Sequence, residues 1–384
     1  MPYSPLAILG YGQTAFGELW DVSLTSLLQS ATLTAIKNSG LKANQIDAIY
    51  VANMASGNYE YQMHLNSLVS SFFPHHPPTF RLEAACASGG LAVVAATHAL
   101  QSGAFKHVLV VGAEKMTDVG TGEATKILSG AASVATEYGS TFPGLYALLA
   151  QLYRSRYHLM PSDLRQALSL ISSRAHDSAL TNQYAQFQKA ISPDAITASP
   201  LVADPLRVFD CSSLSDGAAA IVLTLDSDKK LYPTLPHLIS SGHAQDSLDL
   251  AGRSNLPHLT ATSTATKQTF DQVGITRNDI SVIELHDCFT IAEILAIEDM
   301  GFLKPGTAVT KLLKHGYYKK NLLINPSGGL KACGHPVGAT GIKQIGSVCK
   351  YLTSLPTSSR YGLTHNVGGT GGTVIVHLIE GGKS

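Results

Sequence analysis

Charge and long apolar runs are both scarce in this sequence. Only 14% of the 384 residues are charged, and the 27 Lys and Arg residues balance the 27 Asp and Glu residues. A protein without a basic field has little attraction for a phosphate backbone, so we expect no nucleic-acid partner. No apolar run approaches the roughly 20 residues of a membrane-spanning helix, so we expect no membrane span. With 45% hydrophobic residues and 34 glycines, the composition indicates a compact α/β enzyme with a large buried surface.

Addressing signals and a disulfide framework are also missing. The N-terminal stretch Met1–Pro5 lacks a basic region and a cleavage site, and the C-terminal stretch Gly381–Ser384 is no peroxisomal signal. Five cysteines, an odd number in a long chain, fit reduced thiols better than paired ones. We therefore expect a cytoplasmic protein.

One pattern of residues occurs twice along the chain. The helix-like run from Ser23 to Ser39 leads through a glycine into a strand at 48–54, and a second helix-like run leads in the same way into a strand at 282–285. The match predicts an internal duplication, with halves at about 1–228 and 229–384. The residues that match at one offset are Gly40, Leu41, Asn44, Ile46 and Ile49 with Gly274, Ile275, Asn278, Ile280 and Ile283.

The first half carries extra residues, at about 116–205, that the second half lacks. Their pattern is helical: one run extends from Phe142 to Tyr157, and another begins at Pro161, a residue favoured in the first turn of a helix. An insertion of this size predicts a helical domain that covers the substrate.

A cysteine and a histidine open helical runs at corresponding places in the two halves. Cys86 precedes the run at 90–100 and His335 the run at 340–352, both in stretches rich in small residues. Free N–H groups at a helix N-terminus lower the pKa of a thiol from about 8.5, so Cys86 is a candidate nucleophile and His335 a candidate base. The alternatives are an inert buried cysteine and a histidine of a surface loop.

His286 and Cys288 lie two residues apart where the second-half strand ends. Side chains at this spacing share a face, so one could donate a hydrogen bond to a carbonyl oxygen while the other moves a proton. The alternative is a capping Asp287 with two buried neighbours. A zinc site from these two residues with Cys333 and His335 is disfavoured, because structural zinc usually has two to four residues between paired ligands. We predict no metal.

A glycine-rich loop from His365 to Gly372 offers backbone donors near the end of the chain. The N–H of Gly368 is a candidate oxyanion donor. The pattern G-x-x-x-x-G-K-[ST] is absent, which excludes a P-loop.

The sequence resembles the thiolase superfamily over nearly its whole length. The resemblance rests on Ala85–Gly89 around the cysteine, Ser215–Ala219 at the end of the first half, Gly334–Gly338 around the histidine, and the last glycine loop. It implies an α/β fold with two duplicated βαβαβαββ halves in a layered α/β/α/β/α arrangement. A helical loop domain is inserted in the first half of such a fold.

Two departures from the common thiolase motifs point to a subgroup. The segment His286-Asp287-Cys288-Phe289 stands where most thiolases have Asn-Glu-Ala-Phe, and Asn366-Val367-Gly368 stands where most have Cys-x-Gly. The chain is similar to the sterol-carrier-protein-type and archaeal-type thiolases, in which the His-Asp-Cys-Phe motif supplies the second thiol.

The resemblance implies an acyl-CoA C-acyltransferase that catalyses a reversible Claisen condensation. Cys86 would be acylated by an acyl-CoA with His335 as its base, and Cys288 would move the α-proton. His286 and His335 would hold the thioester oxyanion, while the N–H groups of Cys86 and Gly368 would hold the acyl oxyanion.

The same resemblance implies no cofactor, with CoA thioesters as substrates. It implies a homodimer or homotetramer, and a small OB-fold protein as a further partner. The alternatives are a decarboxylating condensing enzyme of the same fold and a partner-dependent acyl-CoA-binding protein. Cys288 favours the thiolase reaction, because a decarboxylating enzyme needs no second thiol.

Overall fold

The structure is a computed structural model that describes residues 4–316, 318–356 and 360–382. The predictions on addressing signals rest partly on Met1–Tyr3 and Lys383–Ser384, which lie outside the described residues. Among the described residues, none of the helices combines the length and the apolar character that crossing a membrane requires.

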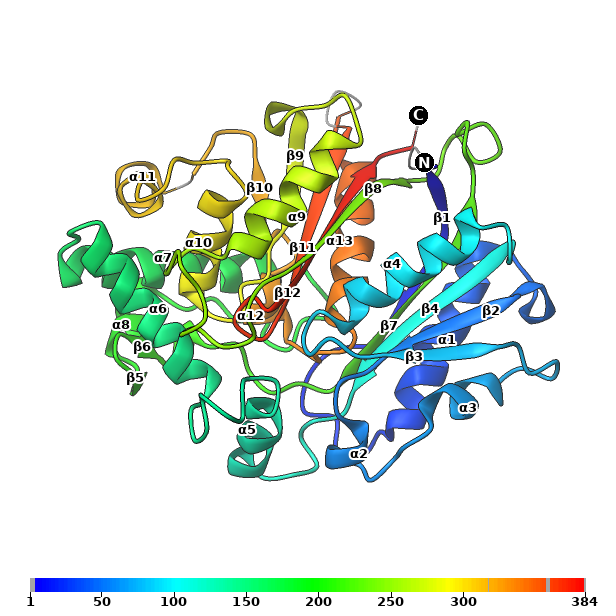
Figure 1. The fold of residues 1–384 in the computed structure, drawn as a ribbon, viewed down its shortest axis with the longest axis horizontal. Helices are drawn as coiled ribbons and strands as arrows, with labels where there is room; N and C mark the ends of the chain where they lie inside the picture. The colour runs from blue at the N-terminus through cyan, green and yellow to red at the C-terminus, as the bar shows by residue number, and fades with distance from the viewer. Residues whose placement is uncertain (1–3, 317, 357–359, 383–384) are drawn as a thin grey trace.

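Ten strands form one large sheet that runs through both halves (Figure 1). The first half contributes β1 (Leu6–Gln13), β2 (Ala48–Ala52), β3 (Thr79–Leu82), β4 (His107–Glu114) and β7 (Gly217–Leu225). The second half contributes β8 (His237–Gln245), β9 (Ile280–Glu284), β10 (Leu323–Ile324), β11 (Tyr361–Gly368) and β12 (Thr373–Glu380).

The two halves of the sheet have the same topology. In the first half β1 pairs antiparallel with β7 and β7 antiparallel with β4, while β4, β2 and β3 run parallel. In the second half β8, β12, β11, β9 and β10 repeat this order and these directions. The halves join where β1 pairs with β8, Leu6 opposite Leu238. The predicted duplication is thus confirmed in the fold, and its exact boundaries, 1–228 and 229–384, remain a prediction.

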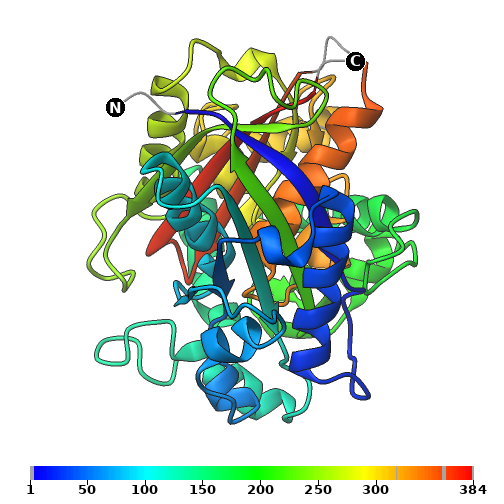
Figure 2. The same cartoon turned by 90° about the vertical axis from the view of Figure 1, so that its right-hand side faces the viewer.

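Helices cover both faces of each half-sheet and complete five layers, which lie side by side in Figure 1 and one behind another in Figure 2. On the outer faces lie α1 (Leu24–Ser39) with α3 (Leu65–Ser70) in the first half and α9 (Thr260–Asp271) with α10 (Thr290–Asp299) in the second. Between the half-sheets lie α4 (Ser88–Gln101) and α13 (Thr340–Ser354), which contact strands of both halves. The local sequence sets the ends of α1: the Ser23 side chain accepts from the Ser26 N–H, and Gly40, at φ 72°, ends the helix.

The predicted helical insertion separates β4 from β7. It contains α5 (Thr121–Ser129), α6 (Phe142–Arg156), α7 (Pro161–Ala179), α8 (Pro193–Ala198) and the short hairpin β5 (Leu201–Ala203) and β6 (Leu206–Arg207). The insertion packs against the second half through α7, which contacts α10, α11 (Ala308–His315) and α12 (Gly329–Cys333). The bounds 116–205 remain a prediction. The other short helices are α2 (Ser56–Tyr59), η1 (Ala43–Gln45), η2 (Val208–Asp210) and η3 (Arg277–Asp279).

Glycines let the N-terminal turns of α4 and α13 touch. A Cβ atom on Gly341 would lie 2.4 Å from the nitrogen of Gly90, and one on Gly89 would lie 2.9 Å from the nitrogen of Gly341. No side chain fits between backbones at these separations. The contact therefore brings together the two loops that precede these helices, which carry Cys86 and His335.

We predict that Gly341→Ala destabilises the protein by on the order of 1–3 kcal/mol, because the new methyl group overlaps backbone atoms that cannot move independently. The midpoint of urea unfolding measures the change. The matched control is Gly122→Ala in α5, where a Cβ atom meets nothing within 4 Å and stability should stay constant or rise slightly. Equal midpoints for Gly341→Ala and the wild type would contradict the close-contact interpretation.

Candidate active site

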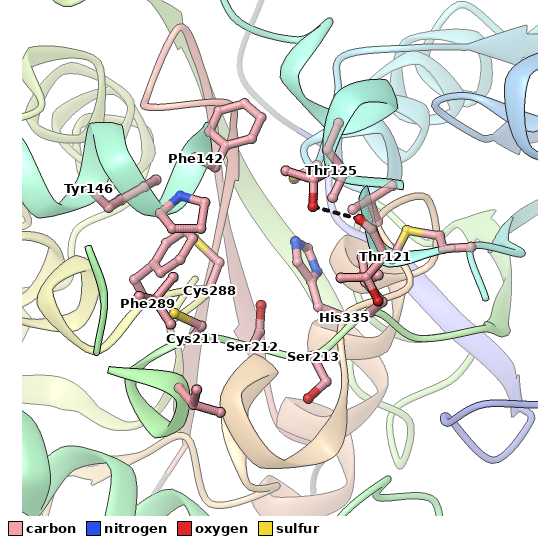
Figure 3. Close-up of a pocket in the computed structure, with 18 of the residues that line it drawn as sticks. Thr121, Thr125, Phe142, Tyr146, Cys211, Ser212, Ser213, Cys288, Phe289 and His335 are labelled. Atoms are coloured by element: carbon pink, nitrogen blue, oxygen red, sulfur yellow. Dashed lines mark hydrogen bonds between the residues drawn. The ribbon is translucent and has the colours of Figure 1, made fainter. Parts of the chain in front are cut away.

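A cavity of about 420 Å³ lies between the halves, beneath the inserted domain. Its walls include Cys86, Cys288 and His335, and α6 contributes Phe142 and Tyr146. In Figure 3, Cys288 lies on the side of Phe142 and Tyr146, and the ring of His335 points into the space from the other side. The volume and the mostly apolar lining are typical of a small-molecule site.

Cys86 enters the cavity from a sharp turn between β3 and α4. Ala85 has φ +51°, a conformation that costs a non-glycine residue about 1–3 kcal/mol. The Ser88 hydroxyl holds the turn: it donates to the Ala85 carbonyl at 2.6 Å and accepts from the Ala84 N–H at 2.9 Å. The strained turn presents the thiol to the cavity.

Two histidines lie beside this thiol. The sulfur of Cys86 and one ring nitrogen each of His286 and His335 all lie within 4.8 Å of one another. The ring centroids of His286 and His335 are 5.1 Å apart and the rings are nearly perpendicular. Both Nε2 atoms are buried and lack a hydrogen-bond partner in the described part of the chain. The site thus joins three segments that are far apart in the sequence.

The proton of His335 is placed by Thr340. His335 Nδ1 lies 2.7 Å from the Thr340 hydroxyl, and this hydroxyl donates to the Pro336 carbonyl at 3.0 Å. Because the hydroxyl proton is used there, its oxygen accepts from the Nδ1–H of His335. Burial, aided by the charge of Lys343, lowers the pKa of His335 to about 3, so the ring is neutral. His335 Nε2 therefore carries a lone pair and can accept a proton.

Asn366 fixes the proton of His286 on the ring nitrogen opposite to the one that is protonated in His335. The Asn366 amide has a fixed orientation, because its Oδ1 accepts from the Gly90 N–H at 3.0 Å and its Nδ2 donates to the Cys86 carbonyl at 2.9 Å. The same Nδ2 faces His286 Nδ1 at 3.5 Å. An amide NH₂ group only donates, so Nδ1 accepts and the proton lies on Nε2. Burial keeps the pKa of His286 well below its usual value, so this ring is also neutral.

These proton positions argue against a metal ion at the site. Cys86, His286 and His335 form the cluster of possible ligands in the described residues, but His286 presents an N–H to the centre rather than a lone pair. Cys333 is held elsewhere, since its sulfur accepts from the Asn182 amide at 3.5 Å. The donor set therefore fits a resident metal poorly, and the absence of a metal remains our prediction.

The thiol of Cys86 differs from the sequence-based expectation. Burial raises the pKa of Cys86 to about 12, although the N–H of Gly369 acts in the opposite direction. The expected lowering by a helix N-terminus is outweighed by desolvation of the thiol, which has the largest effect on its pKa. In this structure Cys86, the candidate nucleophile, and His335, the candidate base, are thus both neutral.

Cys288 lines the same cavity and is almost fully buried. Burial raises the pKa of its thiol well above the usual value, with Cys86 adding to the rise. The alternative role of Asp287 as a cap is partly correct: its Oδ1 accepts from the Leu330 N–H at 2.6 Å and so caps α12. This bond ties the Cys288 segment to the loop that carries His335.

Gly368 ends β11, and a Cβ atom there would lie 2.4 Å from the Ala84 carbonyl oxygen. The glycine loop thus packs directly on the Cys86 turn. Its next residue, Gly369, lines the cavity, and its N–H favours the thiolate form of Cys86. The sequence marked this loop by its glycines but did not single out Gly369, nor Tyr146 and the amide contacts of Asn366.

Comparison with known proteins identifies the family. Residues 6–227 match the model of the thiolase N-terminal domain, and residues 242–380 match the model described as thiolase C-terminal domain-like. The chain therefore belongs to the thiolase family.

Two archaeal relatives match over nearly the whole chain. An acetyl-CoA acetyltransferase of Methanothermobacter thermautotrophicus is 38% identical, covering 98% of this chain and 99% of the relative. One of Methanocaldococcus jannaschii is 40% identical, covering 98% of each. Sterol carrier protein 2 of Homo sapiens is 30% identical over 79% of this chain and 59% of its own length.

Solved structures share the fold at lower sequence identity. The structure described as the Ltp2-ChsH2(DUF35) aldolase has a TM-score of 0.81 at 19% identity, covering 98% of both chains. The Acat5 thiolase of Ascaris suum, solved with coenzyme A, has a TM-score of 0.72 at 20% identity, covering 98% of this chain and 99% of that one.

We predict that alkylation of Cys86 by iodoacetamide accelerates about tenfold per pH unit from about pH 7 to 9.5. A raised pKa leaves only a small thiolate fraction in this range, and that fraction grows with pH. Mass spectrometry of the Cys86 peptide at several pH values gives the rate, with Cys86→Ala as the blank. A rate that levels off below about pH 8.5 would show that the helix N-terminus prevails after all.

We predict that Asn366→Asp lowers kcat/KM by roughly 10²–10³, the usual cost of one oxyanion donor. A carboxylate accepts where the amide donates, so the proton of His286 would move to Nδ1 and leave Nε2 without one. Steady-state kinetics and a thermal melt separate chemistry from folding. The control is Asn38→Asp, which removes an exposed donor to the Tyr11 carbonyl, 2.8 Å away, and should leave kcat/KM unchanged.

Proposed function

We propose that this thiolase cleaves 3-ketoacyl-CoA with CoA, and forms it from an acyl-CoA and acetyl-CoA, through an acyl-enzyme on Cys86. One observation carries the proposal: a single cavity contains two thiols and a histidine lone pair, and a histidine N–H lies beside them. Cleavage and formation of a carbon–carbon bond next to a thioester need these four groups: a nucleophile, its base, a proton carrier and a donor for the enolate oxygen.

In the cleavage direction, the first step forms a bond between Cys86 sulfur and the 3-keto carbon. The Cys86 proton passes to His335 Nε2 as the bond forms, since the thiol is neutral beforehand. The keto oxygen becomes an oxyanion held by the N–H of Cys86 and the predicted donor, the N–H of Gly368.

In the second step the carbon–carbon bond breaks and leaves the acyl group on Cys86. The departing electron pair forms the enolate of acetyl-CoA, whose oxygen is held by the Nε2–H of His286 and by His335, which now carries a proton. Cys288 gives its proton to the enolate carbon and releases acetyl-CoA. A raised pKa suits this role, because Cys288 then starts as a thiol.

In the third step the Cys288 thiolate takes up a proton from solvent, and CoA, which has released its thiol proton to solvent, attacks the acyl carbonyl as a thiolate. The bond between the Cys86 sulfur and the acyl carbon breaks, the Cys86 thiolate recovers its proton from His335, and acyl-CoA is released. Each group returns to its starting state, so these reaction steps require no metal or organic cofactor. Condensation is the same sequence in reverse.

Several parts of the proposal draw on relatives. The two archaeal acetyl-CoA acetyltransferases support an acetyl unit as one product, and the location in the cytoplasm is proposed with them. The structural neighbour described as Ltp2-ChsH2(DUF35) contains a second component, which supports the proposed small OB-fold partner. A homodimer or homotetramer is proposed on the resemblance, and size-exclusion chromatography with light scattering tests it.

We predict that Cys288→Ala stops thiolysis while Cys86 is still acylated. Purified wild type, dialysed against a chelator, should consume acetoacetyl-CoA only when CoA is present. Cys288→Ala should lose about 10²–10⁴-fold in this assay, the usual contribution of a general acid or base. Incubation of the variant with acetyl-CoA should still add one acetyl group to Cys86, seen by intact-protein mass.

The control for Cys288→Ala is Cys349→Ala, which removes a buried thiol of α13 that does not line the cavity. It should retain turnover. Normal turnover by Cys288→Ala would disprove the role of the second thiol. Failure of the wild type to form any acyl-enzyme would favour the acyl-CoA-binding protein, and turnover that requires a carboxylated substrate would favour the decarboxylating enzyme.

A further inference from the structure

Tyr146 is a buried tyrosine that the reaction sequence above does not use. It lies on α6 of the inserted domain, and its side chain lines the cavity together with Cys86 and Cys288 (Figure 3). Only 1% of its surface is exposed. A buried phenol needs a partner for its hydroxyl, so the contacts of this group show what it can do.

Two contacts hold Tyr146 in place. Its hydroxyl donates to the carbonyl of Gly369 at 3.1 Å. Its ring stacks on Phe289, the residue after Cys288, with centroids 4.7 Å apart and planes at 29°. The hydroxyl is therefore fixed between the glycine loop and the segment that carries the second thiol.

We propose that Tyr146 is a positioning residue for proton transfer by Cys288: its hydroxyl donates to Gly369 while Cys288 is a thiol and to the sulfur once Cys288 has become a thiolate. The inference rests on the proposed function, since it assigns a role in the step that Cys288 performs. The step changes no covalent bond of Tyr146, and only the O–H bond rotates between two acceptors.

The surroundings of the sulfur support this assignment. Burial and the neighbouring Cys86 and Asp287 all disfavour a thiolate at Cys288 and raise its pKa, whereas the Tyr146 hydroxyl and the N–H of Phe289 lower it. Burial raises the pKa of Tyr146 well above its usual value, the thiols of Cys288 and Cys86 add to the rise, and Arg253 acts in the opposite direction. Tyr146 is thus the side-chain hydroxyl that stabilises the charge left on Cys288 after it gives up its proton.

The glycine loop does not depend on Tyr146 alone. Arg253 donates to the Thr370 carbonyl at 2.6 Å, and its guanidinium is held in turn by the Ser247 carbonyl at 2.8 and 3.0 Å. Removal of the Tyr146 hydroxyl therefore leaves a second support for the backbone that faces Cys86. Acylation of Cys86 and proton transfer by Cys288 should respond differently to the change.

The test is Tyr146→Phe, which keeps the ring and its stacking on Phe289. Two partial reactions are followed: exchange of labelled CoA into acetyl-CoA, which needs only Cys86 acylation, and exchange of the acetyl-CoA methyl protons into D₂O, which needs Cys288. We expect CoA exchange within about threefold of wild type. We expect methyl-proton exchange and thiolysis to fall about 10–100-fold, the range for one hydrogen bond to a charged group.

The matched control is Tyr153→Phe on the same helix. Its hydroxyl donates to Glu298 at 2.7 Å and does not line the cavity, so its loss affects packing without touching the thiols. Both partial reactions should continue at wild-type rates in this variant. Retained CoA exchange in Tyr146→Phe also demonstrates that the variant is folded.

Two results would overturn the inference: methyl-proton exchange at the wild-type rate in Tyr146→Phe, or an equal fall of both partial reactions, which indicates a structural role. A wild-type protein that catalyses neither exchange would overturn the proposed function, and this inference with it. That outcome is distinguishable because it is seen before any substitution is made.

Discussion

The backbone contact between the first turns of α4 and α13 is the constraint on which the site depends. Gly89 and Gly341 let these turns meet at distances that exclude any side chain. Cys86 precedes one turn and His335 the other, so the contact limits how far apart the candidate nucleophile and its candidate base can be. The duplicated fold makes the contact possible, because α4 and α13 occupy equivalent places between the two half-sheets.

Two residues outside the reacting set give the histidines opposite proton positions. The Thr340 hydroxyl accepts a hydrogen bond from the Nδ1–H of His335, whereas the Asn366 amide donates toward Nδ1 of His286. Asn366, which by the resemblance stands where most thiolases carry a second cysteine, donates to the Cys86 carbonyl and accepts from the Gly90 N–H. The Asn366 side chain therefore joins the Cys86 turn to His286.

The inserted domain covers the cavity, and we propose that it also contributes to the chemistry. Its helix α6 brings Tyr146 to the glycine loop and to the Cys288 segment. Burial of the Cys288 thiol thus keeps it protonated, and the Tyr146 hydroxyl is placed to stabilise the thiolate by donating a hydrogen bond. This combination suits a group that must give up and regain a proton in each turnover.

The fold class and the candidate reacting residues could both be read from the sequence. The duplication was readable because the same glycine and apolar residues recur in register, and Cys86, His286, Cys288 and His335 stood out through motifs confined to a few neighbouring positions. The protonation of these groups depends on contacts that form only in the folded chain. Cys86 was predicted to have a lowered pKa, but burial raises it, since desolvation depends on everything packed around the sulfur. The partners Asn366, Thr340 and Tyr146 likewise act through distances that no local pattern encodes.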